Sequence, residues 1–354
     1  MPWVGRPRPG TPWGIPSRRV ALTRITTLPV MDAEWAGDGF VLPPAASGPD
    51  VAVGLAVGMR RLAVLGARES WPPGRALELP RTAGLVALHP SLGCAAVLGP
   101  GRIEMVGRAP DGSPVETPAR AWTRNTQALG FDITGEGLWT SGVQDGRASL
   151  RVLDARTLSD VAGTEAGLEL GAPTLGEDDL DGLHEWMPHP SLPVMGVAVS
   201  LGQEGTWLTF VERGATGLVR GAAVASVEAP FYPAGFLPDG SGFVGVGGTW
   251  VRRWTYPEAT LAAEFLLPEQ GTLATGYSGL VTERAVLVAV EDLLEVGEWY
   301  LLQLDPASLR PVCAWELPLS TEVVTSVHLL PGGFILSPED GQLWRLPDEV
   351  LSAR

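Results

Sequence analysis

The feature that most constrains the fold is a strand–turn–strand unit that recurs along the chain. Its clearest copy spans Gly235 to Leu261 and reads GFLPDGSGFVGVGGTWVRRWTYPEATL. Strand-forming residues interleaved with glycine lie between clusters of glycine, proline and aspartate. Proline fixes φ and glycine tolerates positive φ, so each cluster favours a tight turn. The pattern predicts a hairpin with strands over Gly242 to Val246 and Trp250 to Tyr256, and with Gly247-Gly248 at its tip.

Six looser copies of this unit precede and follow it. Their anchoring turns are Pro49-Asp50, His89-Pro90, Thr134-Gly135, His189-Pro190, Thr282-Glu283 and Pro331-Gly332. The seven anchors lie on average about 47 residues apart, a period typical of repeats that each build one four-stranded sheet. Further strand candidates lie between the units. The sequence therefore predicts an all-β fold built from seven such sheets, with six as the alternative number.

Composition agrees with a folded, turn-rich chain. Of 354 residues, 45% are hydrophobic and 18% are charged, which disfavours a disordered chain. The 45 glycines and 32 prolines fall between short apolar runs. No long periodic helix is expected, and residues Pro347 to Arg354 form at most a short C-terminal turn. We expect a proline-rich arm over residues 1–17 and a single domain over residues 18–354.

The segment Arg18 to Val30 reads as one β-strand and has no partner within the first unit. The last unit ends near Leu346 and leaves no room for a fourth strand of its own. An unpaired edge strand invites aggregation. The sequence therefore predicts that this N-terminal strand pairs with Gly341 to Leu346 and closes the last sheet.

The net charge of −15 limits the classes of partner. All 25 basic residues are arginine, as is typical of the high-GC coding bias of many bacteria. Binding to nucleic acid or to an anionic membrane needs a basic face, so neither partner is expected. The N-terminus lacks the apolar segment of a secretory signal. We expect a cytoplasmic protein in which Cys94 and Cys313 are reduced and buried.

The chain resembles the β-propeller superfamily, and is WD40-like in a loose sense. The resemblance covers residues 18–347 and is carried by PDGSGFVGVGGTWVRRWTYPEATL, DITGEGLWTSGVQDGRASLRVLDARTL, VEDLLEVGEWYLLQLDPASL and two HPSL segments. The Trp-Asp dipeptide of that family is replaced by Leu153-Asp154 and Leu304-Asp305. The resemblance implies a seven-bladed propeller and leaves the function to its loops.

Three histidines could suggest a metal site. His89 and His189 occupy the same turn position in two units, and His328 lies close to another anchor. Residues that repeat at equivalent positions usually serve the structure. We therefore favour a structural role for these histidines over a shared metal site.

The most polar stretch is Gly176 to His189, GEDDLDGLHEWMPH. Its carboxylates could hold Ca²⁺, which takes about six to eight oxygen ligands, and His184 with His189 could suit a transition metal. A solvated acidic loop is the favoured interpretation, and long loops on rigid scaffolds often bind partners. The predicted partner-binding residues of this stretch are Glu177, Asp178, Asp179, Asp181, His184 and Glu185.

A second acidic segment, Glu291 to Glu298, is expected at the tip of a long hairpin. Exposed apolar residues surrounded by charge suggest a protein contact. Capping of the hairpin by the same residues is an equally good explanation. The predicted contact residues here are Glu291, Leu293 and Leu294.

The sequence shows no nucleophile elbow and no glycine-rich phosphate loop. The favoured hypothesis is therefore a non-catalytic, monomeric protein-interaction scaffold without a cofactor, whose acidic loops bind a protein with a basic surface. The alternative is a propeller enzyme, or a binder of a small ligand or carbohydrate, that uses a central channel with or without a divalent metal.

Overall fold

The computed structural model describes residues 17–27, 40–41, 52–57, 61–66, 76–78, 84–90, 94–107, 119–122, 125–165, 167–173, 184–202, 205–226, 230–267, 273–292, 298–319, 327–330, 333–337 and 342–352. The chain divides into two compact units, which are described separately. One comprises Phe40–Ala46 and Val51–Pro230, and is called the middle unit. The other comprises Met1–Gly39, Ser47–Asp50 and Phe231–Arg354, and is called the terminal unit. The predicted arm lies outside the described residues, except for Ser17.

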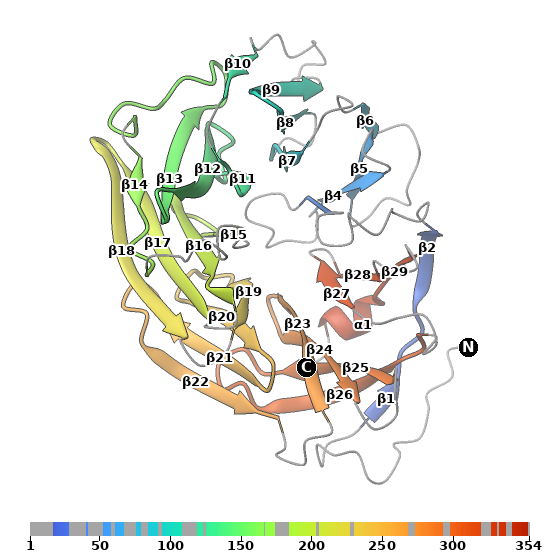
Figure 1. Ribbon diagram of the computed structural model, residues 1–354. Coiled ribbons are helices and arrows are strands. Elements are labelled where there is room, and N and C mark those ends of the chain that lie inside the picture. The colour runs from blue at the N-terminus through green and yellow to red at the C-terminus, as the bar shows by residue number, and fades with distance from the viewer. Residues whose placement is uncertain are drawn as a thin grey trace. The chain divides into compact units, whose positions relative to one another are not determined.

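The described part of the middle unit contains four antiparallel sheets of four strands each, and neighbouring strands in each sheet are consecutive in the chain (Figure 1). The first two sheets are formed by β3 (Phe40–Val41), β4 (Ala52–Val57), β5 (Arg61–Gly66) and β6 (Ala76–Glu78), and by β7 (Leu85–Leu88), β8 (Cys94–Gly99), β9 (Arg102–Gly107) and β10 (Arg120–Ala121). The next two are formed by β11 (Ala128–Phe131), β12 (Gly137–Gln144), β13 (Arg147–Asp154) and β14 (Leu168–Glu169), and by β15 (His184–Pro188), β16 (Val194–Ser200), β17 (Thr206–Gly214) and β18 (Gly217–Ser226).

The terminal unit contains three sheets and a short helix, α1 (Asp348–Ser352). One sheet consists of β19 (Phe231–Phe236), β20 (Gly242–Gly247), β21 (Trp250–Thr255) and β22 (Leu261–Leu266). The second consists of β23 (Leu273–Val281), β24 (Val286–Asp292), β25 (Glu298–Leu304) and β26 (Pro311–Leu317), with β1 (Ser17–Arg19) as a fifth strand. The third consists of β27 (His328–Leu330), β28 (Phe334–Ser337), β29 (Gln342–Arg345) and β2 (Thr23–Thr27).

The described residues form seven sheets, and seven units were expected from the sequence. Each predicted anchoring turn falls between the first and second strands of its own sheet. The all-β prediction is therefore confirmed, and α1 is the only helix among the described residues. None of the described helical segments is long and apolar enough to cross a membrane.

The β20–β21 hairpin shows why this sequence folds locally. Trp250 and Trp254 are buried on one face and pack against Phe231, and Val251 is buried on the other. The prediction of a Gly247-Gly248 tip is wrong by one residue, because Gly247 pairs with Trp250. Neither of these two glycines has positive φ. Gly247 serves a close approach instead, since a Cβ there would overlap the Trp250 ring.

The N-terminal segment differs from its prediction. The expected single strand over Arg18 to Val30 is two strands, β1 and β2, which join different sheets of the terminal unit (Figure 1). The break follows from Val20, whose side chain is 3% exposed and packs in a core cluster with Trp315 and Leu317. Because Val20 is buried in this cluster, the strand ends there and the chain passes from the sheet of β26 to the sheet of β29. The predicted pairing with Gly341 to Leu346 is confirmed, because β2 runs antiparallel to β29.

Each unit has its own apolar core of strand residues. Two clusters lie in the terminal unit, and their largest buried members include Trp299, Trp315 and several leucines and valines. Two further clusters fill the spaces between sheets of the middle unit. Cys94 and Cys313 are buried thiols, as predicted. Burial raises the pKa of the Cys313 thiol.

Candidate functional site

Four of the turns between first and second strands share one device, a side-chain acceptor for backbone N–H groups. His189 Nδ1 accepts from the N–H groups of Ser191 and Leu192, at 3.2 and 3.0 Å. The corresponding turns use Oδ1 of Asp132, Oδ1 of Asp239 and Oγ1 of Thr282. A short polar side chain in such a turn replaces water as the partner of the backbone. His189 therefore stabilises its turn.

His89 also serves the fold. Its Nε2 donates to the carbonyl oxygen of Gly135 at 3.1 Å, and burial lowers its pKa. The structural role that the repeat positions predict for His89 and His189 is confirmed. His328 is the first residue of β27. Among the described residues, no group of three or more histidines, cysteines, aspartates and glutamates could hold a metal ion.

The acidic stretch Gly176 to His189 is only partly described. Glu177, Asp178, Asp179 and Asp181 lie outside the described residues, whereas His184 and Glu185 begin β15 rather than a loop. His184 is 7% exposed, and its Nδ1 is hydrogen-bonded to Ser141 Oγ of β12 at 2.8 Å. Burial lowers the pKa of His184 to about 4 and raises that of Glu185 to about 7. The structure thus joins His184 to the neighbouring sheet.

The second acidic segment, Glu291 to Glu298, runs from the end of β24 to the first residue of β25. Leu293 and Leu294 lie outside the described residues, and the half-buried Glu291 belongs to β24. Asp292 stands directly opposite Glu298 in the strand register. The hydroxyl of Tyr300 donates to Glu298 Oε2 at 2.8 Å, and burial together with Glu298 raises the pKa of Tyr300. Burial also raises the pKa of Glu291. This end of the hairpin therefore gathers carboxylates around one tyrosine.

Sequence reasoning missed a polar cleft in the middle unit. The cleft has a volume of about 420 Å³ and is lined by residues of the β12–β13 hairpin, among them Thr140, Gly142, Ser149 and Arg151. Trp122 and Asn125 also line it. Leu138 lies two residues before Thr140 on the same face of β12, and it is fully buried in a core cluster. The change from leucine to threonine and glycine along one strand face is the signal that marks where the apolar packing ends.

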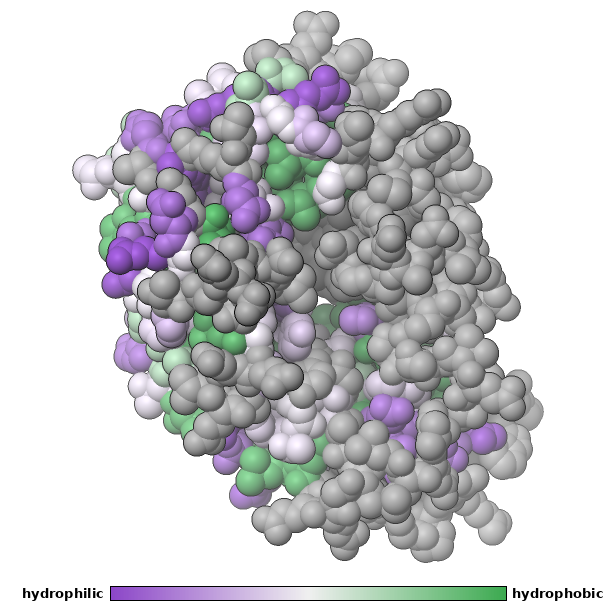
Figure 2. Space-filling model, in the orientation of Figure 1, coloured by the Kyte–Doolittle hydropathy of each residue, from purple (hydrophilic) through white to green (hydrophobic). Residues whose placement is uncertain are grey.

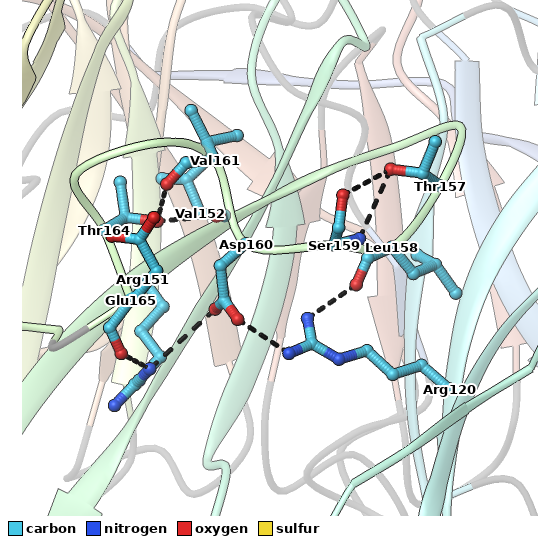
Figure 3. Close-up of polar contacts among 10 residues, drawn as sticks. All are labelled: Arg120, Arg151, Val152, Thr157, Leu158, Ser159, Asp160, Val161, Thr164 and Glu165. Atoms are coloured by element: carbon cyan, nitrogen blue, oxygen red, sulfur yellow. Dashed lines mark hydrogen bonds and ion pairs between the residues drawn. The ribbon is translucent and has the colours of Figure 1, made fainter.

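A chain of ion pairs lies beside this cleft (Figure 3). Asp160 Oδ2 accepts from Arg120 Nη2 at 2.6 Å, and Asp160 Oδ1 lies 3.8 Å from Arg151 Nη1. Arg151 also donates to the carbonyl oxygen of Glu165, and Arg120 donates to that of Leu158. Hydrophilic residues gather over the β13–β14 region at the upper left of Figure 2. Since both arginines are engaged with protein oxygens, the cluster fastens β10 to the loop between β13 and β14.

Comparison with known proteins decides the fold. No family model and no curated protein matches the chain. The β-propeller domain of Cps50 (Swd1) from Myceliophteria thermophila aligns over 92% of this chain and 100% of that domain, with a TM-score of 0.58 and 10% sequence identity. The chain has a β-propeller fold. Two more distant structures are the C-terminal WD40 domain of Sif2 (11% identity, 93% and 99% coverage, TM-score 0.46) and KlAtg21 in complex with the coiled coil of AgAtg16 (11%, 76% and 81%, 0.46).

The aspartates of the Leu153-Asp154 and Leu304-Asp305 dipeptides stabilise the turns that follow them. Asp154 is the last residue of the third strand of its sheet and Asp305 follows the third strand of its own. Each Oδ1 accepts two backbone N–H groups of the next turn. Leu158 and Leu309 then adopt left-handed φ values of 56° and 53°. The serine hydroxyl and backbone at residue 308 lower the pKa of Asp305. In this propeller each aspartate caps a turn, and the leucine before it, Leu153 or Leu304, is buried in the core.

Proposed function

We propose that this propeller is a non-catalytic protein-interaction scaffold that contacts its partner through two acidic segments. The first comprises Glu177, Asp178, Asp179 and Asp181, and the second comprises Glu291, Leu293 and Leu294. His184 and Glu185 are left out of the contact because burial shifts the pKa of both side chains. The proposal treats residues 18–354 as one seven-bladed domain that is monomeric and cytoplasmic. The seven sheets of the described residues and the two buried thiols support it.

The observation that carries the proposal is the pairing of like charges at the end of the β24–β25 hairpin. Asp292 stands opposite Glu298, and like charges directly opposite each other destabilise a sheet. Burial raises the pKa of the adjacent Glu291, because desolvation makes its ionised form less stable. This end of the hairpin therefore carries three carboxylates, those of Glu291, Asp292 and Glu298. A partner with a basic surface would complement their charge and bind with electrostatic steering.

Histidine and serine side chains, which could serve in catalysis, have structural contacts here, and this supports a scaffold. His89 and His189 hold turns, and Ser141 is hydrogen-bonded to His184. Each of these contacts is accounted for by the packing of the sheets. The fold itself does not fix the function, so the charged hairpin carries the argument.

Charge reversal provides the test. In one variant Glu291, Asp292 and Glu298 become lysine, and in a matched control the exposed Glu136, Glu165 and Glu212 become lysine. Both variants change the net charge equally. We expect partners captured by the wild-type protein from its host to lose binding to the first variant and keep it with the control. Wild-type binding should also weaken as salt is raised. The absence of a reproducible partner, or equal binding by both variants, would refute the proposal.

A further inference from the structure

Two sheets of the terminal unit have the same geometry in their last two strands. The β21–β22 and β25–β26 connections each place one residue at left-handed φ, Ala259 at 54° and Leu309 at 53°. Each of these residues donates its N–H to the carbonyl oxygen four residues earlier. The strand registers also agree, since Trp250 pairs with Leu266 and Tyr300 pairs with Glu316. Residues 50 positions apart are therefore equivalent in these two strand pairs.

The edge of β26 is covered by the short strand β1. This strand runs parallel to β26 and pairs its three residues with Ala314, Trp315 and Glu316. The Arg18 guanidinium lies 5.6 Å from the centroid of the Trp315 ring, and Arg19 Nη2 lies 3.0 Å from Glu316 Oε1. The edge of a fourth strand in this protein thus accepts an extended, arginine-bearing segment.

The equivalent edge of β22 has no paired strand among the described residues (Figure 1). By the offset of 50, Glu264, Phe265 and Leu266 occupy the positions of the three β26 residues that β1 covers. Leu266 is 59% exposed and Leu261 is 50% exposed, two of the few large apolar side chains that are exposed in the described part of the chain. Phe265 offers an aromatic ring where β26 has Trp315. An open edge with apolar side chains is a template for strand addition.

We propose that the free edge of β22 binds an extended basic segment of a partner protein by parallel strand addition. The segment has an arginine opposite Phe265 and an apolar residue opposite Leu266. The arginine takes the place that Arg18 has over Trp315, and the apolar residue covers Leu266. The net charge of −15 favours a basic segment over an acidic one. The inference rests on the proposed scaffold function only in requiring a protein partner, and it assigns a different surface.

The chain supplies a probe for this edge. A labelled peptide with the sequence of residues 15–22, IPSRRVAL, contains two arginines followed by a valine. Shifted by one residue from the register that β1 has on β26, it places the arginines opposite Glu264 and Phe265 and the valine opposite Leu266. Binding to the full-length protein is measured by fluorescence anisotropy, and a photo-reactive group in the peptide marks its location. The control peptide IPSAAVAL lacks both arginines.

We expect saturable binding of IPSRRVAL, cross-links to β21 and β22, and weaker binding of the control peptide. Leu266→Lys should weaken binding about tenfold or more, because it removes the apolar contact and repels arginine. Leu192→Lys, at another exposed leucine, should leave binding unchanged. No binding at millimolar peptide, cross-links confined to β26, or equal effects of the two lysine variants would overturn the inference. The assay needs no native partner, so its failure leaves the acidic hairpin proposal standing, and failure of that proposal leaves this assay interpretable.

Discussion

His89 Nε2 lies 3.1 Å from the carbonyl oxygen of Gly135 and so joins the first turns of two sheets in the middle unit. The imidazole also stands edge-on to Phe131, with ring centroids 5.0 Å apart. Gly135 has a φ of 73°, and a Cβ at this residue would overlap the His89 ring. Both the backbone conformation and the close approach therefore require glycine here.

Gly135→Ala should destabilise the protein by roughly 3 kcal/mol, because left-handed strain adds to the overlap with His89. Gly101 is the matched control, since its φ is 74° and a Cβ there would meet nothing within 4 Å. Gly101→Ala should cost about 1 kcal/mol from strain alone. Urea unfolding followed by tryptophan fluorescence measures both. Equal costs would show that the contact with His89 contributes nothing.

The bond between Ser141 and His184 gives a second prediction. Ser141→Ala leaves Nδ1 of a buried histidine without its partner, and an unsatisfied buried polar group costs about 1–3 kcal/mol. The exposed Ser191, whose backbone rather than hydroxyl serves its turn, provides the control. Ser191→Ala should change the free energy of unfolding by less than about 0.5 kcal/mol. A Ser141→Ala protein as stable as the control would contradict the role assigned to this bond.

Much of the fold follows from local sequence signals. The Pro-Asp-Gly turn before β20 and the alternation around Trp250 place a hairpin, because turn chemistry and side-chain period agree there. The same holds for the aspartate turns at Asp154 and Asp305. What the sequence could not place is the break at Val20, because it depends on a core cluster formed with residues almost 300 positions away. The displaced tip at Gly247 likewise depends on the ring of Trp250.

The candidate site was harder to predict. The acidic run before His184 indicates a solvated loop, yet His184 and Glu185 already belong to β15. The hydrogen bond from a different sheet that holds His184 has no signal in the local sequence. The polar cleft was equally hard to predict. It lies where Thr140 and Gly142 follow the buried Leu138 on one face of β12. Tertiary contacts decide such positions.

Glu185 gives a prediction for pH. Burial raises its folded-state pKa to about 7 from the usual 4.5, so its contribution favours folding below pH 4.5 and is lost as pH rises through 7. Glu185→Gln cannot ionise and avoids this loss. The variant should therefore gain on the wild type by up to about 3 kcal/mol between pH 4.5 and pH 8. Urea unfolding across this range measures the gain.

His184 acts in the opposite direction in both proteins. Its folded-state pKa of about 4 lies below the usual 6.5, so stability is lost as pH falls from 6.5 towards 4. Comparing wild type with Glu185→Gln at each pH cancels this effect. A difference between the two proteins that does not change with pH would contradict the buried state of Glu185.

The account depends most on the pairing of β2 with β29, which joins residues 23–27 to residues 342–345 in one sheet. The direct measurement is the solution state of a chain that lacks residues 1–30, by size-exclusion chromatography with light scattering and by circular dichroism. A chain that lacks residues 1–16 and keeps both β1 and β2 is the control. The longer deletion should give an aggregated or insoluble product because β29 loses its partner strand, while the control remains monodisperse. A monodisperse, fully folded protein without residues 1–30 would contradict the account.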